Sequence, residues 1–164
     1  MDITDIRIGN GYDVHQLGEG LDLFLGGVKI PHTKGCIAHS DGDVAIHALC
    51  DAILGALALG DIGKHFPDTD PKYKDANSLS LLKQVCKKIK ERGYKINNID
   101  SNIIAQAPKM MPYIPKMKDS LAKLLDINPN EISIKAKTKE KLDSVGESLA
   151  IEANAVILLK RIDL

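Results

Sequence analysis

The chain has 164 residues, of which 44% are apolar and 27% charged, a balance typical of one globular domain (residues 1–164) with a sizeable core. Basic and acidic residues are equal in number, so the net charge of zero removes the electrostatic case for nucleic-acid binding. No apolar run approaches the roughly 20 residues of a membrane span, and the N-terminus lacks the pattern of a signal or transit peptide. We expect a cytoplasmic protein, or a plastid protein whose leader has been removed.

The first half of the chain is predicted to form two strands and a buried helix. Residues 5–14 and 22–30 have the composition of strands, and their glycines indicate bends or close backbone approach. After a loop, Ser40 is predicted to cap a helix that runs to Gly60, with Asp43 completing a capping box. This helix is apolar nearly all round, so we expect it to lie between a sheet and another layer.

The second half alternates between helices and strands. It is predicted to contain a polar loop (residues 61–77), a helix (78–92), a strand (96–106), a second helix (114–125) and two final strands (131–138 and 149–159). The last strand is apolar on both faces near its end, so it is either central to the sheet or covered by another subunit. This order predicts an α+β fold, a mixed β-sheet with helices packed on one face.

Side chains that can bind metals concentrate in the first third of the chain. Asp13 and His15 alternate along an extended segment and therefore share one face, and His47 follows on the predicted helix. One carboxylate and two imidazoles leave a position open on a tetrahedral zinc, as catalytic zinc sites do. The alternative is a surface Asp-x-His turn and a core histidine held by Asp51 at i+4. Spacing alone leaves both interpretations open.

Five further segments could take part in binding a ligand, and four of them have a simpler explanation. Residues 39–43 could present helix N–H groups to a phosphate, or only cap the helix. Residues 61–63 and 66–70 could recognise a hydroxyl-rich ligand, or form a solvated loop. Residues 105–111 could present backbone groups to a flat polar ring. In residues 135–141, Thr138 and Glu140 are predicted to share a strand face, where the hydroxyl could bind phosphate and the carboxylate could hold Mg²⁺. The alternative is a strand edge guarded by lysines.

Six motifs resemble the 2-C-methyl-D-erythritol 2,4-cyclodiphosphate synthase family, from about residue 8 to the last strand. They are, in order, GYDVHQL, GGVKIPH, KGCIAHSDGDVAIHAL, LGDIGKHFPDTDP, IIAQAPKM and KAKTKEKL. The resemblance implies conversion of 4-diphosphocytidyl-2-C-methyl-D-erythritol 2-phosphate to the 2,4-cyclodiphosphate and CMP, in non-mevalonate isoprenoid precursor synthesis. The 2-phosphate would attack the β-phosphorus of the diphosphate. The family's assembly implies a homotrimer with active sites between subunits.

The resemblance also implies roles for individual residues. The Zn²⁺ ligands would be Asp13, His15 and His47. Glu140 would bind Mg²⁺ or Mn²⁺, and His39 and Thr138 would stabilise charge in the transition state. Residues 105–111 would form the cytosine pocket of the neighbouring subunit. The substrate-binding residues would be Asp13, Val14, His15, His39, Ser40, Asp61, Ile62, Gly63, Phe66, Pro67, Asp68, Thr69, Asp70, Ala105, Gln106, Ala107, Pro108, Lys109, Met110, Met111, Lys137, Thr138, Lys139 and Glu140.

One segment departs from the common pattern of the family. Many members continue after Lys-Leu with GFxGRGEG, whereas this chain has DSVGES over residues 143–148. The anion-binding arginine is therefore absent, and its roles are not implied for Ser144 or Glu147. Two alternatives to the synthase are a non-catalytic zinc- and nucleotide-binding protein on the same scaffold and a metal-dependent phosphohydrolase. The intact catalytic positions count against the non-catalytic alternative.

Overall fold

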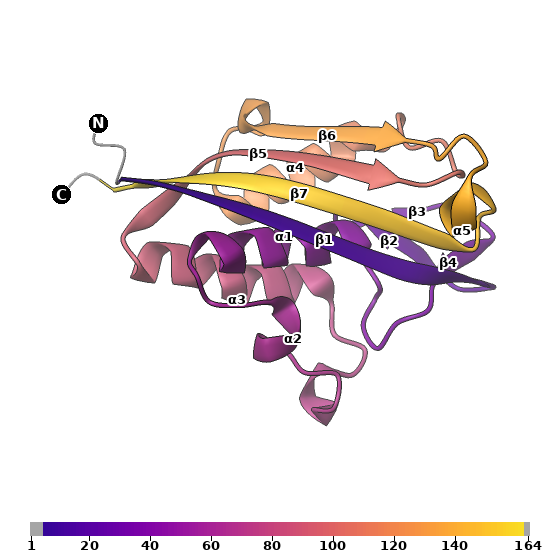
Figure 1. Cartoon of the computed structure of the whole chain (residues 1–164), viewed down its shortest axis with the longest axis horizontal. Coiled ribbons are helices and arrows are strands. Elements are labelled where there is room, and N and C mark those ends of the chain that lie inside the picture. Colours follow the sequence, from indigo (N-terminus) through magenta and orange to yellow (C-terminus); the bar gives the residue numbers. More distant parts are fainter. Residues whose placement is uncertain (1–4, 163–164) are drawn as a thin grey trace.

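The computed structural model describes residues 5–162 and shows a five-stranded sheet with its main helices on one face (Figure 1). The strand order is β4-β1-β7-β5-β6. The strands are β1 (Ile6–Glu19), β4 (Lys34–Cys36), β5 (Tyr94–Ile104), β6 (Ile132–Lys137) and β7 (Ala150–Arg161). β5 and β6 are parallel and the other neighbours are antiparallel, so the predicted mixed sheet and α+β class are confirmed. β7 is central, one of the two places predicted for it.

The predicted strand over residues 22–30 is in fact a hairpin of two short strands, β2 (Leu23–Leu25) and β3 (Val28–Ile30). Gly26 and Gly27 form its turn with φ angles of 59° and 75°, which glycine adopts without strain. The predicted loop that follows contains β4, which pairs with the end of β1. Both differences arise because turn chemistry, rather than the apolar pattern, decided where these strands end.

Helix α1 (Val44–Ala56) begins after Asp43, so the prediction that Ser40 is its N-cap was wrong. The Asp43 carboxylate accepts the Ile46 N–H at 3.1 Å and also the N–H groups of Gly26 and Gly27, at 2.9 and 2.7 Å. One buried carboxylate therefore caps the helix and fastens the hairpin turn, which makes it the better cap. The helix ends at Ala56 rather than at Gly60.

Helix α1 lies directly on β1 because β1 has glycines where the helix crosses it. An ideal Cβ at Gly9 would lie 1.8 Å from the backbone oxygen of Ala52, and one at Gly11 would lie 1.9 Å from that of Ala48. Any larger residue at either position would push the two elements apart. This close approach brings His47, on the first turns of α1, to the side chains that follow Gly11 on β1.

The other helices cover the remainder of the same face (Figure 1). They are α3 (Ser78–Glu91) and α4 (Ile114–Leu125). The short elements are α2 (Ile62–His65), η2 (Pro71–Tyr73), η3 (Pro129–Glu131) and α5 (Asp143–Gly146), of which α2 contacts α1 and α5 contacts β7. Asn77 caps α3 as predicted, and Gly93 follows its end with a φ of 76°. The predicted loop over residues 61–77 contains α2 and η2 instead of being continuous coil. Among residues 5–162, no helix has the length and apolarity that a bilayer span needs.

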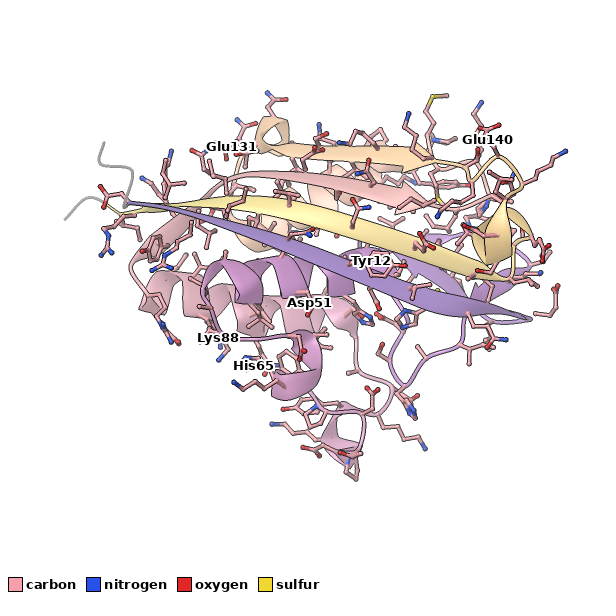
Figure 2. The ribbon with its side chains drawn as sticks, in the orientation of Figure 1. Tyr12, Asp51, His65, Lys88, Glu131 and Glu140 are labelled. Carbon is pink, nitrogen blue, oxygen red and sulfur yellow. The ribbon has the colours of Figure 1, made fainter. Side chains whose placement is uncertain are left out.

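The opposite face of the sheet is open in one chain. Tyr12 lies on this face in β1, where 52% of it is exposed, and Ile8 is 69% exposed (Figure 2). Val156 of β7 is 40% exposed on the same face, whereas its neighbours Ala155 and Ile157 point into the core. A sheet with one buried face has this alternation, but here the outer positions are partly apolar.

Candidate metal centre and active site

Asp13, His15 and His47 meet where α1 crosses β1, as the sequence predicts, and their ligand atoms lie within 4.8 Å of one another. Oδ2 of Asp13 is 3.1 Å from Nδ1 of His15 and 3.0 Å from Nδ1 of His47. The buried Nδ1 of His15 forms no hydrogen bond within the described residues despite this proximity. A carboxylate oxygen and two imidazole nitrogens that converge in this way, one of them unsatisfied, fit a divalent metal ion.

The pKa values in this cluster reflect the charges of its members. Burial favours the neutral form of Asp13, but the contacts and charges of His15 and His47 outweigh it and lower the pKa of Asp13 to about 2. Burial also favours neutral His47, yet the contact with the Asp13 carboxylate raises the pKa of His47 above its ordinary value. Without a metal, the pair is therefore held together as an ion pair.

The predicted pairing of His47 with Asp51 was wrong. Nε2 of His47 lies 2.9 Å from Oγ of Ser78 and 3.3 Å from Oγ of Ser40. Asp51 instead accepts the N–H of Ile62 at 2.6 Å and so fixes the start of α2. The i+4 spacing placed both residues on α1, but the imidazole turns toward β1 and α3 while the carboxylate turns toward α2.

A cavity of about 350 Å³ lies beside Asp13, His15 and His47. Ten of the predicted site residues line it: Asp13, Val14, His15, His39, Ser40, His47, Ile62, Gly63, Phe66 and Asp68. Asp61 and Asp70 cap short helices instead, accepting the N–H groups of Lys64 and Lys72. The lining also includes residues that the sequence analysis did not select: Gln16, Ile37, Ala38, Tyr73 and Leu81. Tyr73 could have been suspected, because an aromatic residue in a polar loop needs a partner. Here the partner is Phe66, whose ring centroid lies 5.2 Å from that of Tyr73 in an edge-to-face arrangement.

The remaining predicted segments come together at a different edge of the sheet. Gln106 accepts the N–H of Lys141 at 3.1 Å, and the N–H of Ala105 donates to the backbone oxygen of Lys137 at 2.9 Å. Residues 105–111 and 137–140 thus form one surface, and none of them lines the cavity described above. In Figure 2, Glu140 lies beyond the end of β6, while Asp51 lies on α1 below β1.

Thr138 and Glu140 are adjacent, but they do not share a strand face as predicted. β6 ends at Lys137, and Glu140 has a φ of 51° in the turn that follows. The hydroxyl of Thr138 donates to Oε1 of Glu140 at 2.8 Å, so the two groups are held together by a direct contact. The turn after β6, rather than the alternation of a strand, therefore brings the hydroxyl and the carboxylate together.

A model of the YgbB family matches residues 6–160 of the chain. The chain belongs to this family. It is 54% identical to the 2-C-methyl-D-erythritol 2,4-cyclodiphosphate synthase of Fusobacterium nucleatum, over 95% of this chain and 98% of that relative. The bifunctional IspDF of Campylobacter jejuni is similar in structure, with a TM-score of 0.93 and 47% identity over 96% of this chain and 43% of that one. A CDP complex of IspF from Plasmodium falciparum has a TM-score of 0.86 and 40% identity over 99% of this chain and all of that one.

In this YgbB-family chain, the departing segment 143–148 forms α5 and the turn after it. Nζ of Lys139 lies 3.2 Å from Oδ2 of Asp143 and 3.4 Å from Oε2 of Glu152 on β7. Lys139, which was predicted to bind substrate, is therefore held between two carboxylates in the isolated chain. Lys139 is thus a cation that faces Glu152 at this end of the sheet.

Two further residues around the metal-binding cluster were not identified as partners from the sequence. Ser78 is only 1% exposed at the start of α3, and Asp41 precedes α1 in the loop that contacts it. Asp41 falls within residues 39–43, for which the sequence predicts phosphate binding or helix capping, and a serine after an Asn cap has the appearance of ordinary helix-start chemistry. Nothing in the local spacing connects either residue with His47.

Proposed function

We propose that the protein converts 4-diphosphocytidyl-2-C-methyl-D-erythritol 2-phosphate to 2-C-methyl-D-erythritol 2,4-cyclodiphosphate and CMP, a step of non-mevalonate isoprenoid precursor biosynthesis. The observation that carries this proposal is the near-complete match at 54% identity to a synthase of that name, together with the converging Asp13, His15 and His47. One domain over residues 1–164 carries the activity. A single buried core drawing on the large sheet and its helices supports that assignment.

We assign Zn²⁺ to Asp13, His15 and His47, because two imidazoles and one carboxylate form a typical three-residue zinc site with an open position. Glu140 supplies a carboxylate for Mg²⁺ or Mn²⁺, which favour oxygen ligands. When bound, these cations draw negative charge from phosphate oxygens and so reduce the repulsion between the two phosphoryl groups.

The side chains of the protein itself position the substrate. The 2-phosphate is its own nucleophile, so the reaction needs no nucleophilic residue and depends on alignment and electrostatics. His39 lies at the exposed edge of the cavity, where its imidazole can contact the phosphate. Thr138, already in contact with Glu140, offers its hydroxyl to the diphosphate. The cavity residues from α2 and the following loop, Ile62, Gly63, Phe66 and Asp68, contact the methylerythritol portion.

We further propose a homotrimer with each active site shared by two subunits. In one chain, the surface formed by residues 105–111 and 137–140 is separate from the cavity, so a complete site needs both surfaces from different copies. The open sheet face, with Ile8, Tyr12 and Val156, provides apolar area for association. Residues 105–111 then supply the cytosine pocket to the neighbouring subunit, and the CDP complex of a structural relative supports a cytidine nucleotide as the ligand.

A product assay tests the proposal. Purified protein is incubated with the cytidine diphosphate substrate and Mg²⁺, and the products are followed by ³¹P NMR and nucleotide chromatography. We expect one cyclic diphosphate for each CMP released, and loss of both after treatment with a zinc chelator. Uncyclised phosphates would identify a phosphohydrolase, and nucleotide binding without turnover would identify a non-catalytic zinc and nucleotide-binding protein. Either result would overturn the proposal.

A further inference from the structure

The imidazole of His47 is held from both sides of the ring. The residue is 8% exposed, and its Nδ1 faces Asp13 at 3.0 Å. Its Nε2 faces away from the metal-binding cluster, toward the hydroxyl of Ser78 at 2.9 Å. Ser40 is a more distant neighbour of Nε2, at 3.3 Å. One ring nitrogen, Nδ1, therefore faces the cluster, and the other, Nε2, faces α3.

Ser78 is in turn fixed by Asp41. The Ser78 hydroxyl donates to Oδ1 of Asp41, and the Ser78 backbone N–H donates to Oδ2 of the same carboxylate at 2.9 Å. Both oxygens of Asp41 are thereby occupied as acceptors of Ser78. With Ser78 1% exposed, water cannot readily replace these contacts.

Counting the protons in this chain of contacts determines which nitrogen of His47 can bind a metal. A serine hydroxyl has one proton, and a carboxylate can only accept, so Ser78 gives its proton to Asp41 and can only accept from His47. Nε2 of His47 must therefore carry a hydrogen. In the neutral ring the lone pair is then on Nδ1, the nitrogen that faces Asp13 and His15.

We propose that Ser78, oriented by Asp41, is a positioning residue that selects the Nε2–H tautomer of His47 and so presents the Nδ1 lone pair to the metal. This inference rests on the zinc site of the proposed function. Neither residue lines the cavity beside the cluster. They act through His47, as carboxylates and carbonyls behind metal-bound histidines commonly do.

The same contacts tie the loop before α1 to the start of α3. The N–H of Asp41 donates to the backbone oxygen of Ala76 at 3.2 Å, and that of Asp75 donates to the backbone oxygen of His39 at 2.7 Å. Ser40 and Ala76 form an isolated bridge between these contacts. Asp41 is therefore placed by backbone pairing that does not involve the metal ligands, as a fixed orienting group must be.

The tautomer can be measured in the unaltered protein. Long-range ¹H–¹⁵N correlation spectra of the zinc-loaded, ¹⁵N-histidine-labelled protein distinguish a protonated ring nitrogen from a metal-bound one. We expect a hydrogen on Nε2 of His47, with its signal assigned by loss in His47→Gln. A hydrogen on Nδ1, or two populated tautomers, would overturn the inference without any substitution at Ser78.

Variants test the dependence on Ser78 and Asp41. Ser78→Ala is expected to weaken zinc binding, measured by competition with a chromophoric chelator, by about 10- to 100-fold. Asp41→Asn should act in the same direction, because its amide can donate to Ser78 and let the hydroxyl turn toward Nε2. Ser78→Thr keeps the hydroxyl and should restore most of the affinity. Ser80→Ala, in the exposed first turn of the same helix, is the matched control.

Zinc affinity, the His47 spectrum and the melting temperature together distinguish a positioning role of Ser78 from a purely structural one. A purely structural role would lower the melting temperature of Ser78→Ala while leaving its zinc affinity and the His47 spectrum unchanged, and zinc binding within twofold of the unaltered protein would overturn the inference. Failure of the unaltered protein to bind zinc and form cyclic product would instead overturn the proposed function. If Ser78→Ala does not fold, the zinc affinity of Asp41→Asn and the His47 spectrum of the unaltered protein still test the inference.

Discussion

Oδ2 of Asp13 lies 3.0 Å from Nδ1 of His47, across the point where α1 passes over β1. The two residues are 34 positions apart in the chain, and β1 and α1 approach closely enough for this contact because of Gly9 and Gly11. Packing between a strand and a helix, rather than a local motif, therefore assembles the metal-binding cluster.

This ion pair predicts how the stability of the metal-free protein depends on pH. Asp13 titrates at about 2 rather than 3.8, so its contribution is present above pH 3.8 and is lost as the pH falls toward 2. The pKa of His47 is raised above 6.5, so its contribution is present below 6.5 and is lost as the pH rises through the folded value. In thermal melts with chelator, the ion pair should stabilise the fold most between pH 3.8 and pH 6.5, by about 1–2 kcal/mol in the free energy of unfolding. Asp13→Asn should flatten the profile, and an unchanged profile would contradict the pairing.

Removal of one imidazole should abolish metal binding and turnover together. In His47→Ala, only two of the three ligands remain, and we expect zinc content and the rate of cyclic product formation to fall by at least about 100-fold. Metal analysis after gel filtration and the product assay measure the two effects. His32→Ala is a matched histidine control outside the cavity lining. Full activity in zinc-free His47→Ala would exclude the metal role.

Gly11 should tolerate no side chain. A Cβ there would lie 1.9 Å from the backbone oxygen of Ala48, so Gly11→Ala must separate β1 from α1 or distort one of them. We expect a loss of about 3 kcal/mol in the free energy of unfolding and weaker zinc binding, because the ligands are on the two separated elements. Gly55→Ala within α1 has room, with its nearest contact at 3.7 Å, and should be neutral or slightly stabilising. Equal stability of the two variants would show that the close approach is unimportant.

The open sheet face should mediate subunit association. Val156→Glu places a charge among partly exposed apolar residues, and we expect the trimer to dissociate or weaken at micromolar concentrations. Sedimentation velocity measures the mass directly. Leu21→Glu, at a residue 43% exposed outside the sheet, should leave the mass unchanged. A Val156→Glu protein that stays trimeric would place the interface elsewhere.

Sharing of the active site between subunits predicts complementation. His39→Ala and Thr138→Ala proteins should each be nearly inactive, because each lacks one side of every site. Mixed trimers, formed by co-expression and purified through two affinity tags, should recover about a third of the sites, the one site in each trimer that combines an intact His39 with an intact Thr138 from a neighbour. Activity that stays at the background of the two variants would mean that each site is built from one chain.

The sequence was sufficient for much of the fold and for the metal-binding residues. Periodicity located α3, α4, β5, β6 and β7 with small shifts at their ends, and the mixed sheet followed from their order. The motifs supplied Asp13, His15 and His47, because the chain has only five histidines and the grouping of two of them with a carboxylate is therefore informative. The apolar period of a segment is a property of the sequence itself, so the predictions of α3, α4, β5, β6 and β7 were confirmed.

The tertiary structure decided which partner each functional side chain has. From spacing, His47 was expected to pair with Asp51, whereas in the structure it contacts Asp13 and Ser78. Ser40 was expected to cap the helix, whereas Asp43 caps α1 and also binds the hairpin turn. The tertiary structure also placed Thr138 and Glu140 on a surface separate from the cavity. The direction in which a side chain points, and what it meets there, depends on how distant elements approach one another. For α1 and β1 that approach is set by backbone contact at two glycines, which no local pattern around His47 encodes.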